Sequence, residues 1–440
     1  MAKDGLAQDF GFRVLDFGST ESSHCSLRYR PALAPTLAVG LAALFFVAAG
    51  CGPGSPPLMP NWAAREQPYT PEEGSSNAYD SYALLGRNVE ETLPPELLNR
   101  VYFDPDYENK VFSRVEKPLG SLISASKKKC EFRYSAQPMF TPAPYQRGWR
   151  ILGRALCWKI ERACAAGAYD EAIDGEIAAT KFGFDLTGGS AMDASLGFDI
   201  ADEARKAISP YIARFGTAQL GVLAEGLTSA IQGKPSLKAT IEHEHGRMLE
   251  GVQYVQDAYA NDRFDDLIKR MKEDVRDGVA YLRELKGQDA KKRPSYFEGF
   301  AREADEESRW LTSIADLPAT QRKTERGPDL AAQRPWKSFA KQFFTAAEPL
   351  LKIQDSTVAR TRLAILTCEI LKQVKTDGRA PKDLGGFPKN LTLDPYTGRE
   401  FAYRVSGPVF DVYSLGSDGI DNGGDTDESF FAPDLRLEDR

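Results

Sequence analysis

An acidic loop near the end of the sequence holds the residues best suited to chemistry. Four aspartates and one glutamate lie within the eleven residues that begin at Asp418, and three glycines are interleaved with them. So many carboxylates in one loop repel one another unless a hard cation neutralises them, and oxygen ligands on a flexible backbone suit Ca²⁺. The spacing differs from an EF-hand, because Ile420 and Ser429 occupy two ligand positions. We therefore expect a calcium loop of another kind; an acidic loop without metal is the alternative.

The residues before this loop predict a helix followed by a small antiparallel sheet. A helix is expected over residues 356–375, and Gly378 ends it. A turn is expected over residues 394–398, since it contains both proline and glycine. Two strands with alternating apolar residues come next, at Phe401, Tyr403 and Val405 and at Phe410, Val412 and Ser414.

Residues 356–431 resemble the C-terminal end of the major pseudopilin of type II secretion. The matching residues are the turn Asp394-Pro-Tyr-Thr-Gly, the strand and loop Phe410-Asp-Val-Tyr-Ser-Leu-Gly-Ser-Asp-Gly, and Asp425-Thr-Asp427. The resemblance implies one bound Ca²⁺, with these ligands: the carboxylates of Asp418, Asp425 and Asp427 and the backbone carbonyl of Leu415. Asp421 stays open as a further ligand, because the loop length varies in that family.

The resemblance to pseudopilins does not extend to the beginning of the chain. In that family the module follows a hydrophobic N-terminal helix that starts with a sequence like Phe-Thr-Leu-Ile-Glu, which is missing here. As a whole, residues 77–431 are more similar to exported bacterial lipoproteins in which a helical body precedes the same end module. This similarity implies an architecture rather than an activity.

The first 50 residues carry the marks of an export signal. Arg28 and Arg30 precede an uncharged stretch over residues 31–50, which ends in small residues directly before Cys51. A positive flank, an apolar run and small residues before a cleavage point are typical of a secretory signal. The residues before Cys51 also resemble a bacterial lipobox, which implies lipidation of Cys51 and a membrane-anchored protein outside the cytoplasm, periplasmic or on the outer membrane. A transmembrane helix is the alternative, since about 20 apolar residues can span a bilayer.

Helical periodicity dominates the rest of the chain. Trp149, Leu152, Leu156, Ile160 and Ala163 form one apolar stripe, and Gly167 separates it from a second helix, as in a tetratricopeptide-type hairpin. Further helices are expected over these residues: 191–215, 217–232, 236–260, from 262 towards 287, from 294 through 311, and from 335 through 350.

These patterns divide the chain into four parts. They are a signal peptide or hydrophobic anchor (1–50), a tether (51–76), a helical body (77–352) and a pseudopilin-like module (353–440). We predict a mainly α fold, an irregular antiparallel helical bundle or short solenoid, followed by a small α+β module with an antiparallel sheet.

One cluster in the body invites a metal or catalytic interpretation, namely Glu242-His243-Glu244-His245. Residues that share a helix face are three or four apart, whereas His243 and His245 are two apart and point in different directions. We therefore predict a solvated polar face rather than a metal site. The sequence also lacks the common nucleophile and phosphate-loop motifs.

Four cysteines follow Cys51, namely Cys130, Cys157, Cys164 and Cys368. Cys157 and Cys164 are separated by roughly 10 Å along one expected helix, too far for a disulfide. Either Cys130 pairs with one of these two, or the cysteines are free and buried.

Composition narrows the function classes. A net charge of −7 argues against nucleic-acid binding, and only three histidines lower the expectation of hydrolytic or zinc chemistry. We expect a non-enzymatic cell-envelope lipoprotein with a structural or interaction role, an envelope protein partner and a Ca²⁺-stabilised module. One alternative is an envelope ligand-binding protein with a pocket between helices. The other is a hydrolase with unrecognised carboxylate chemistry.

Overall fold

The computed structural model describes residues 70–99, 104–132, 143, 145–263, 265, 287, 293–322, 347–424 and 434–437. Within these ranges the protein is mainly helical and has one small antiparallel sheet near its C-terminal end, which confirms the predicted fold at this level. The predicted signal segment and Cys51 lie outside the described residues, as do most of residues 262–292 and residues 323–346.

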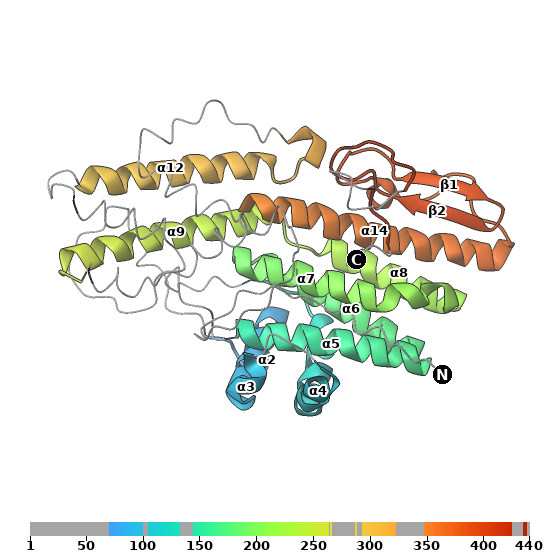
Figure 1. Cartoon of the computed structure of the whole chain (residues 1–440), viewed down its shortest axis with the longest axis horizontal. Coiled ribbons are helices and arrows are strands. Elements are labelled where there is room, and N and C mark those ends of the chain that lie inside the picture. Colours follow the sequence, from blue (N-terminus) through green and yellow to red (C-terminus); the bar gives the residue numbers. More distant parts are fainter. Residues whose placement is uncertain are drawn as a thin grey trace, which may run out of the picture.

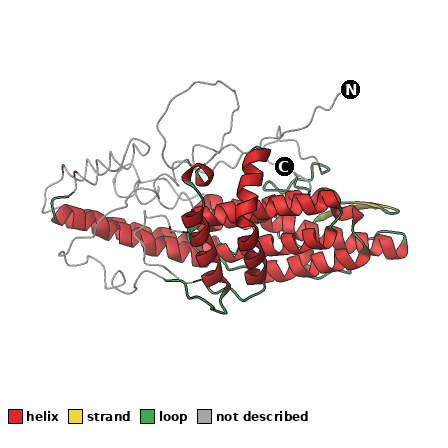
Figure 2. Cartoon of the chain, turned by 90° about the horizontal axis from the view of Figure 1, so that it is seen from below, coloured by secondary structure: helices red, strands yellow, loops and turns green. Residues whose placement is uncertain are grey.

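The helices of the body occupy most of the described chain. Their bounds are α2 (Ala78–Thr92), α3 (Pro95–Leu98), α4 (Pro105–Ser126), α5 (Gln146–Ala166), α6 (Tyr169–Leu186), α7 (Ala191–Ile208), η1 (Ser209–Arg214), α8 (Thr217–Gln232), α9 (Leu237–Ala260), α12 (Arg293–Ile314) and η2 (Ala319–Gln321). Helices α5 to α8 run along the long axis of the molecule, whereas α4 is seen end-on in Figure 1 and therefore crosses them. Figure 2 shows the same crossing from below. Helix α12 packs along α9.

The α5–α6 hairpin forms where its sequence predicts it. All five residues of the predicted stripe are buried, and Trp149 is 0 % exposed. Helix α5 ends at Gly167, whose φ of 74° is the left-handed conformation that glycine adopts without strain. The next helix, α6, then packs back against α5.

Close packing of α2 on α5 depends on glycine at two facing positions. A Cβ atom added to Gly148 would come within 1.9 Å of the Gly86 carbonyl oxygen, so the two backbones touch. Beside this contact, the indole N–H of Trp149 donates to the Tyr82 carbonyl oxygen at 2.7 Å, which satisfies the polar group of a fully buried ring.

The helical segment predicted over residues 191–215 is present and is divided into an α-helix and a 3₁₀ helix. It begins as predicted, because Ser190 and Asp193 form a reciprocal capping box. The α-helix stops at Ile208, and a 3₁₀ turn continues to Arg214. Pro210 lies at the start of this turn, where its missing N–H cannot extend the α-helical bonding.

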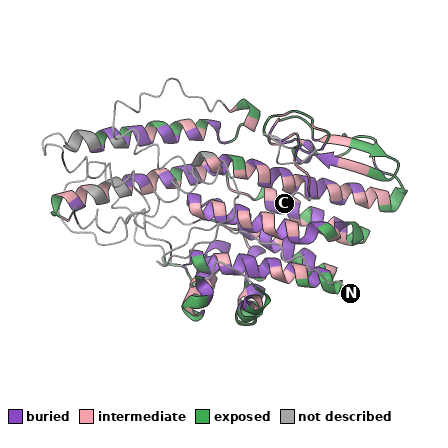
Figure 3. Cartoon of the chain, in the orientation of Figure 1, coloured by how far each residue is buried: buried purple, intermediate pink, exposed green. Residues whose placement is uncertain are grey.

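The elements of the C-terminal part are α14 (Ala347–Asp377), α15 (Lys389–Thr392), β1 (Ala402–Ser406) and β2 (Val409–Tyr413). Helix α14 contains the helix predicted over residues 356–375 and packs against α7 and α8 of the body. One hydrophobic core includes residues on both sides of residue 352, for example Leu223 of α8 and Leu363 of α14. Figure 3 shows that the buried faces of these helices are turned towards one another.

The two predicted strands form an antiparallel hairpin. Tyr403 pairs with Val412 and Val405 with Phe410, and the strands are joined at Gly407, whose φ is 64°. The predicted turn precedes them, with the Gly398 N–H donating to the Asp394 carbonyl oxygen at 2.8 Å. Strand β2 contacts α14, which fixes the hairpin to the body.

None of the helices within the described residues has the length and apolar character required to cross a membrane.

Candidate calcium site in the C-terminal module

The acidic loop begins where β2 ends and is closed by residues 434–437. The backbone N–H of Ser414 donates to the Leu435 carbonyl oxygen at 2.9 Å, and the N–H of Leu435 donates back to Ser414 at the same distance. This antiparallel bridge extends the pairing beyond β2. It brings Asp434 to the loop from a point in the sequence beyond the predicted ligands.

Asp434 is a buried acid at the centre of this arrangement. Its side chain is 0 % exposed. Oδ2 accepts hydrogen bonds from the backbone N–H groups of Asn422 at 3.0 Å and Gly424 at 2.7 Å. Oδ1 is also buried, yet it has no hydrogen-bond partner within the described part of the chain. Burial, followed by the charges of Asp421 and Asp418, raises the pKa of Asp434.

Asp418, a predicted ligand, is exposed on the loop. Its Oδ1 accepts from the backbone N–H of Ile420 at 2.9 Å. Leu415, the predicted carbonyl ligand, is fixed from its other side, because its N–H donates to Asp394 Oδ2 at 3.2 Å. The structure therefore describes two of the four predicted ligands; Asp425 and Asp427 lie outside the described residues.

Asp421 is bound to protein groups instead. Its Oδ1 accepts from the Tyr413 hydroxyl at 2.8 Å and from the backbone N–H of Gly423 at 2.8 Å. Arg404 lies 3.2 Å from both of its oxygens. These contacts, the Tyr413 hydrogen bond first among them, lower the pKa of Asp421. This carboxylate is thus neutralised without a metal.

The described loop residues offer a buried oxygen that suits a bound cation, but they do not supply enough ligands for a complete site. A buried carboxylate oxygen without a partner is costly, and a cation beside it would remove that cost. Among the described residues alone, however, no group of three or more His, Cys, Asp or Glu side chains is arranged to hold a metal. A complete calcium site therefore requires ligands from residues 425–433.

The sequence pattern did not identify Asp434. It lies seven residues after Asp427, outside the dense acidic stretch and outside the segment that resembles pseudopilins. The available signal was the alternation of Leu435 and Leu437 directly after it, which is typical of a short strand. A strand at that position can pair with β2 and carry the preceding acid to the loop.

The predicted solvated face at residues 242–245 is wrong for its central residues. Glu242 is exposed, but Glu244 is 3 % exposed and accepts from the backbone N–H of Ala191 at 2.7 Å. His243 packs on Phe132 with ring centroids 4.6 Å apart, and burial lowers its pKa. His245 lies 2.7 Å from Asp305 of α12. The two histidines thus contact different elements, and Glu244 caps the start of α7.

The four cysteines within the described residues are free thiols, which favours the second of the two predicted states. Cys157, Cys164 and Cys368 are buried, and Cys130 is partly buried. Burial raises the pKa of Cys164 to about 11, which keeps this thiol protonated and unreactive at neutral pH.

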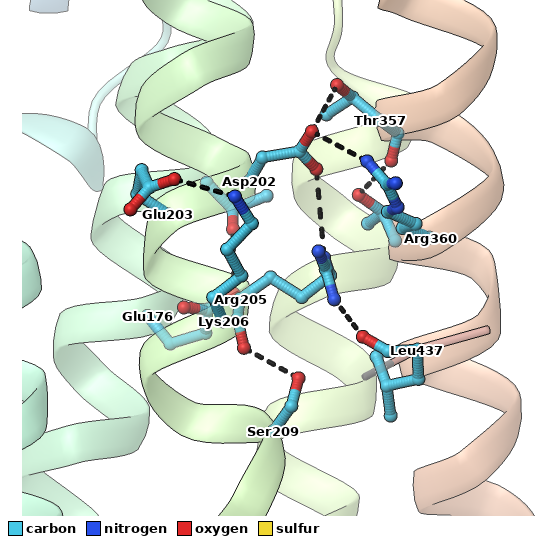
Figure 4. A network of polar contacts seen from close by, with 11 residues as sticks. Glu176, Asp202, Glu203, Arg205, Lys206, Ser209, Thr357, Arg360 and Leu437 are labelled. Carbon is cyan, nitrogen blue, oxygen red and sulfur yellow. Dashed lines mark hydrogen bonds and ion pairs between the residues drawn. The ribbon is translucent and has the colours of Figure 1, made fainter. Parts of the chain in front are cut away.

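A second group of charged residues lies inside the body, between α7 and α14 (Figure 4). Asp202 accepts from the Thr357 hydroxyl and from Arg360, both at 3.3 Å. Arg205 Nε lies 3.7 Å from Asp202, and Arg205 Nη1 donates to the Leu437 carbonyl oxygen. This network therefore joins α7, α14 and the segment that closes the acidic loop.

Glu176 of α6 lies beside this network and is 1 % exposed. Thr180 donates to its Oε1 at 3.1 Å. Burial raises the pKa of Glu176 to about 8, although Thr180 and Arg205 oppose this shift. A carboxyl group so fully enclosed by helices is suited to packing rather than to contact with a substrate.

Comparison with known proteins identified no relative of this chain. It matches no protein-family model, no curated protein and no solved structure.

Proposed function

We propose that this chain is a non-enzymatic lipoprotein of the cell envelope, in which a calcium-bound, pseudopilin-like module is fastened to a helical body that offers a surface to an envelope protein partner. The observation that carries the calcium part is the buried Asp434 Oδ1, which has no hydrogen-bond partner among the described residues and faces an acidic loop. The ion would be held by Asp434, Asp418, Asp425 and Asp427 and by the Leu415 carbonyl.

Calcium would act in this protein on stability. A divalent cation neutralises carboxylates that otherwise repel one another, and it holds the residues on both sides of the loop together. Because such an ion binds the folded chain and not the unfolded one, it stabilises the fold by mass action. The protein's own groups position the ligands: Asn422 and Gly424 orient Asp434, and Asp394 orients Leu415.

The non-enzymatic assignment is supported by where the acids of the body lie. Two acids of the body have a pKa that burial raises to near neutrality: Glu176, with a pKa of about 8, is 1 % exposed, and Asp199, with a pKa of about 7, lies on α7 among the acids Asp202 and Glu203. Asp202 and Asp185 are bound to cations of the same helices or of α14. These acids stabilise the packing of helices, and a general acid or base must instead reach a substrate.

The membrane anchor rests on Cys51 and the apolar segment before it. Replacement of this cysteine in the full-length chain, Cys51→Ser, is expected to abolish metabolic labelling with a radioactive fatty acid and to release the protein from the membrane fraction. A Cys130→Ser variant serves as the matched control and should stay labelled. Unchanged labelling of the Cys51 variant would contradict lipidation at this residue.

The calcium site is tested by thermal unfolding of the full-length protein in detergent, with calcium and with chelator, together with metal analysis. At a free calcium concentration 100 times Kd, the stabilisation should be about 2.7 kcal/mol. Asp434→Asn should lose most of this stabilisation. Glu400→Gln, which changes an exposed acid of the same module, should keep it. A wild-type protein with no bound metal and no shift would refute the proposal.

A further inference from the structure

Residues 434–437 contact the acidic loop at one end and the core of the helical body at the other. Asp434 binds the loop through the N–H groups of Asn422 and Gly424, and Leu435 pairs with Ser414 at the end of β2. Arg436 then pairs with Asp411 of β2 at 2.7 Å. Every residue of this segment up to Arg436 is therefore fixed to the module.

The last described residue of the segment is fixed to the body instead. Leu437 is 7 % exposed and belongs to the main hydrophobic core. Its carbonyl oxygen accepts from Arg205 Nη1, and Arg205 is itself 3 % exposed on α7 (Figure 4). Arg205 also lies near Asp202, which Arg360 of α14 binds.

The shortness of the segment makes these two attachments interdependent. Three peptide steps separate Asp434 from Leu437, and even a fully extended chain covers only about 3.3–3.6 Å per residue. A movement of Asp434 away from the loop would thus pull on Leu437. That pull would remove an acceptor from a buried guanidinium group, which is unfavourable because the group cannot replace it with water.

We propose that residues 434–437 form a strap that couples metal occupancy of the acidic loop to the packing of α7 in the helical body. This inference rests on the proposed calcium site. A cation bound at Asp434 holds the strap on the loop, and the docked strap in turn keeps Leu437 on Arg205. By thermodynamic reciprocity, loss of the Arg205 contact must weaken calcium binding by the same factor as calcium strengthens that contact.

The test combines calcium binding with hydrogen exchange on the full-length protein in detergent. Calcium is titrated into three chains: the wild type, Arg205→Ala, and a chain that lacks residues 437–440 but keeps Asp434 and Arg205. Lys206→Ala is the matched control, because Lys206 pairs with Glu203 on the same helix. The readouts are the calcium Kd and the exchange rates of amides in residues 202–208.

In the wild type and in Lys206→Ala, calcium should slow the exchange of residues 202–208 by about fivefold or more, a coupling in the usual range between linked sites. In Arg205→Ala and in the shortened chain, this effect should disappear and the calcium Kd should rise by about fivefold or more. If Arg205→Ala fails to fold, the shortened chain decides. Calcium binding with wild-type Kd and unchanged slowing in the shortened chain overturns the strap alone. Absence of calcium binding to the wild type overturns the site and the strap together.

Discussion

The helical body and the acidic loop differ in the charges that lie beside their buried carboxylates. In the body, buried carboxylates have a cation of the fold beside them: Asp185 has Lys181, Asp355 has Arg322, and Glu176, whose Oε2 has no hydrogen-bond partner among the described residues, has Arg205. In the loop, the buried Asp434 also has an oxygen without a hydrogen-bond partner among the described residues, but the charges that act on it are those of two further acids, Asp421 and Asp418.

This difference indicates that the helical body needs no ligand to balance its charges, whereas the acidic loop needs a bound cation. The buried acids of the body have cations of the fold beside them, although Glu176 is only partly compensated, so the body is expected to be stable without any ligand. The loop has more negative charge than its own cations neutralise, since Arg404 and Arg436 are engaged with Asp421 and Asp411. An acidic loop with such an excess of negative charge is stabilised by a bound cation.

The largest effect is expected when a buried pair of the body is broken. Arg322 and Asp355 have side chains 6 % and 4 % exposed, and Arg322 connects the segment after α12 to α14. Removal of one partner leaves an uncompensated buried charge, so Arg322→Ala should destabilise the protein by about 3–5 kcal/mol. Urea unfolding in the presence of chelator measures this change without any contribution from calcium.

Lys110→Ala provides the matched control, because Lys110 pairs with Asp106 on the surface, where the side chains are 55 % and 72 % exposed. Its effect should stay below about 0.5 kcal/mol. Equal effects of the two substitutions would contradict the view that the body depends on its buried pairs.

A smaller effect, with a characteristic dependence on pH, is expected at Glu176. Its pKa rises from an ordinary value of 4.5 to about 8 in the folded protein, first because of burial. The folded state thus holds the proton more tightly than the unfolded chain does. The resulting stability is fully present below pH 4.5, is lost progressively as the pH rises, and is gone above about pH 8.

Glu176→Gln cannot ionise and should escape this loss. At pH 9 it should be more stable than the wild type by about 1–3 kcal/mol, the usual cost of a poorly compensated buried polar group, and the difference should shrink towards pH 5. Urea unfolding at pH 5, 7 and 9 measures it, with the exposed Glu225→Gln as control. A difference that does not change with pH would show that Glu176 is already ionised in the folded state.

Local patterns predicted the elements of the fold well. The stripe that includes Trp149, the glycine end of α5 and the alternation in β1 and β2 all depend on residues close together in sequence. Such signals survive in the structure because each element buries the face that its own spacing defines. The change from α-helix to 3₁₀ helix after Ile208 has a local cause as well, because Pro210 has no N–H to continue the α-helical bonding.

Polar residues with distant partners were the ones that sequence reasoning misjudged. Glu244 looks like a surface residue, yet it is buried because it caps α7 through Ala191, which lies 53 positions away in the sequence. Asp434 reaches the loop only through the bridge between Leu435 and Ser414. Of the predicted ligands, Asp418 was recognisable from charge density and glycine spacing, but neither feature shows where each carboxylate points.

The smallest effect is expected at Asp421, and it tests whether charge density or geometry selects the ligands. Asp421 belongs to the same acidic stretch as Asp418, but Tyr413, Gly423 and Arg404 already bind its oxygens. Asp421→Asn should therefore change the calcium Kd by less than about threefold, equivalent to roughly 0.6 kcal/mol. Isothermal titration of this variant beside Asp418→Asn makes the comparison direct, because both substitutions remove one negative charge from the same loop. An equal and large loss of affinity in both variants would mean that the loop binds calcium through its total charge. A loss confined to Asp418→Asn would mean that Asp418 binds the ion, whereas Asp421, like the buried acids of the body, is neutralised by groups of the protein.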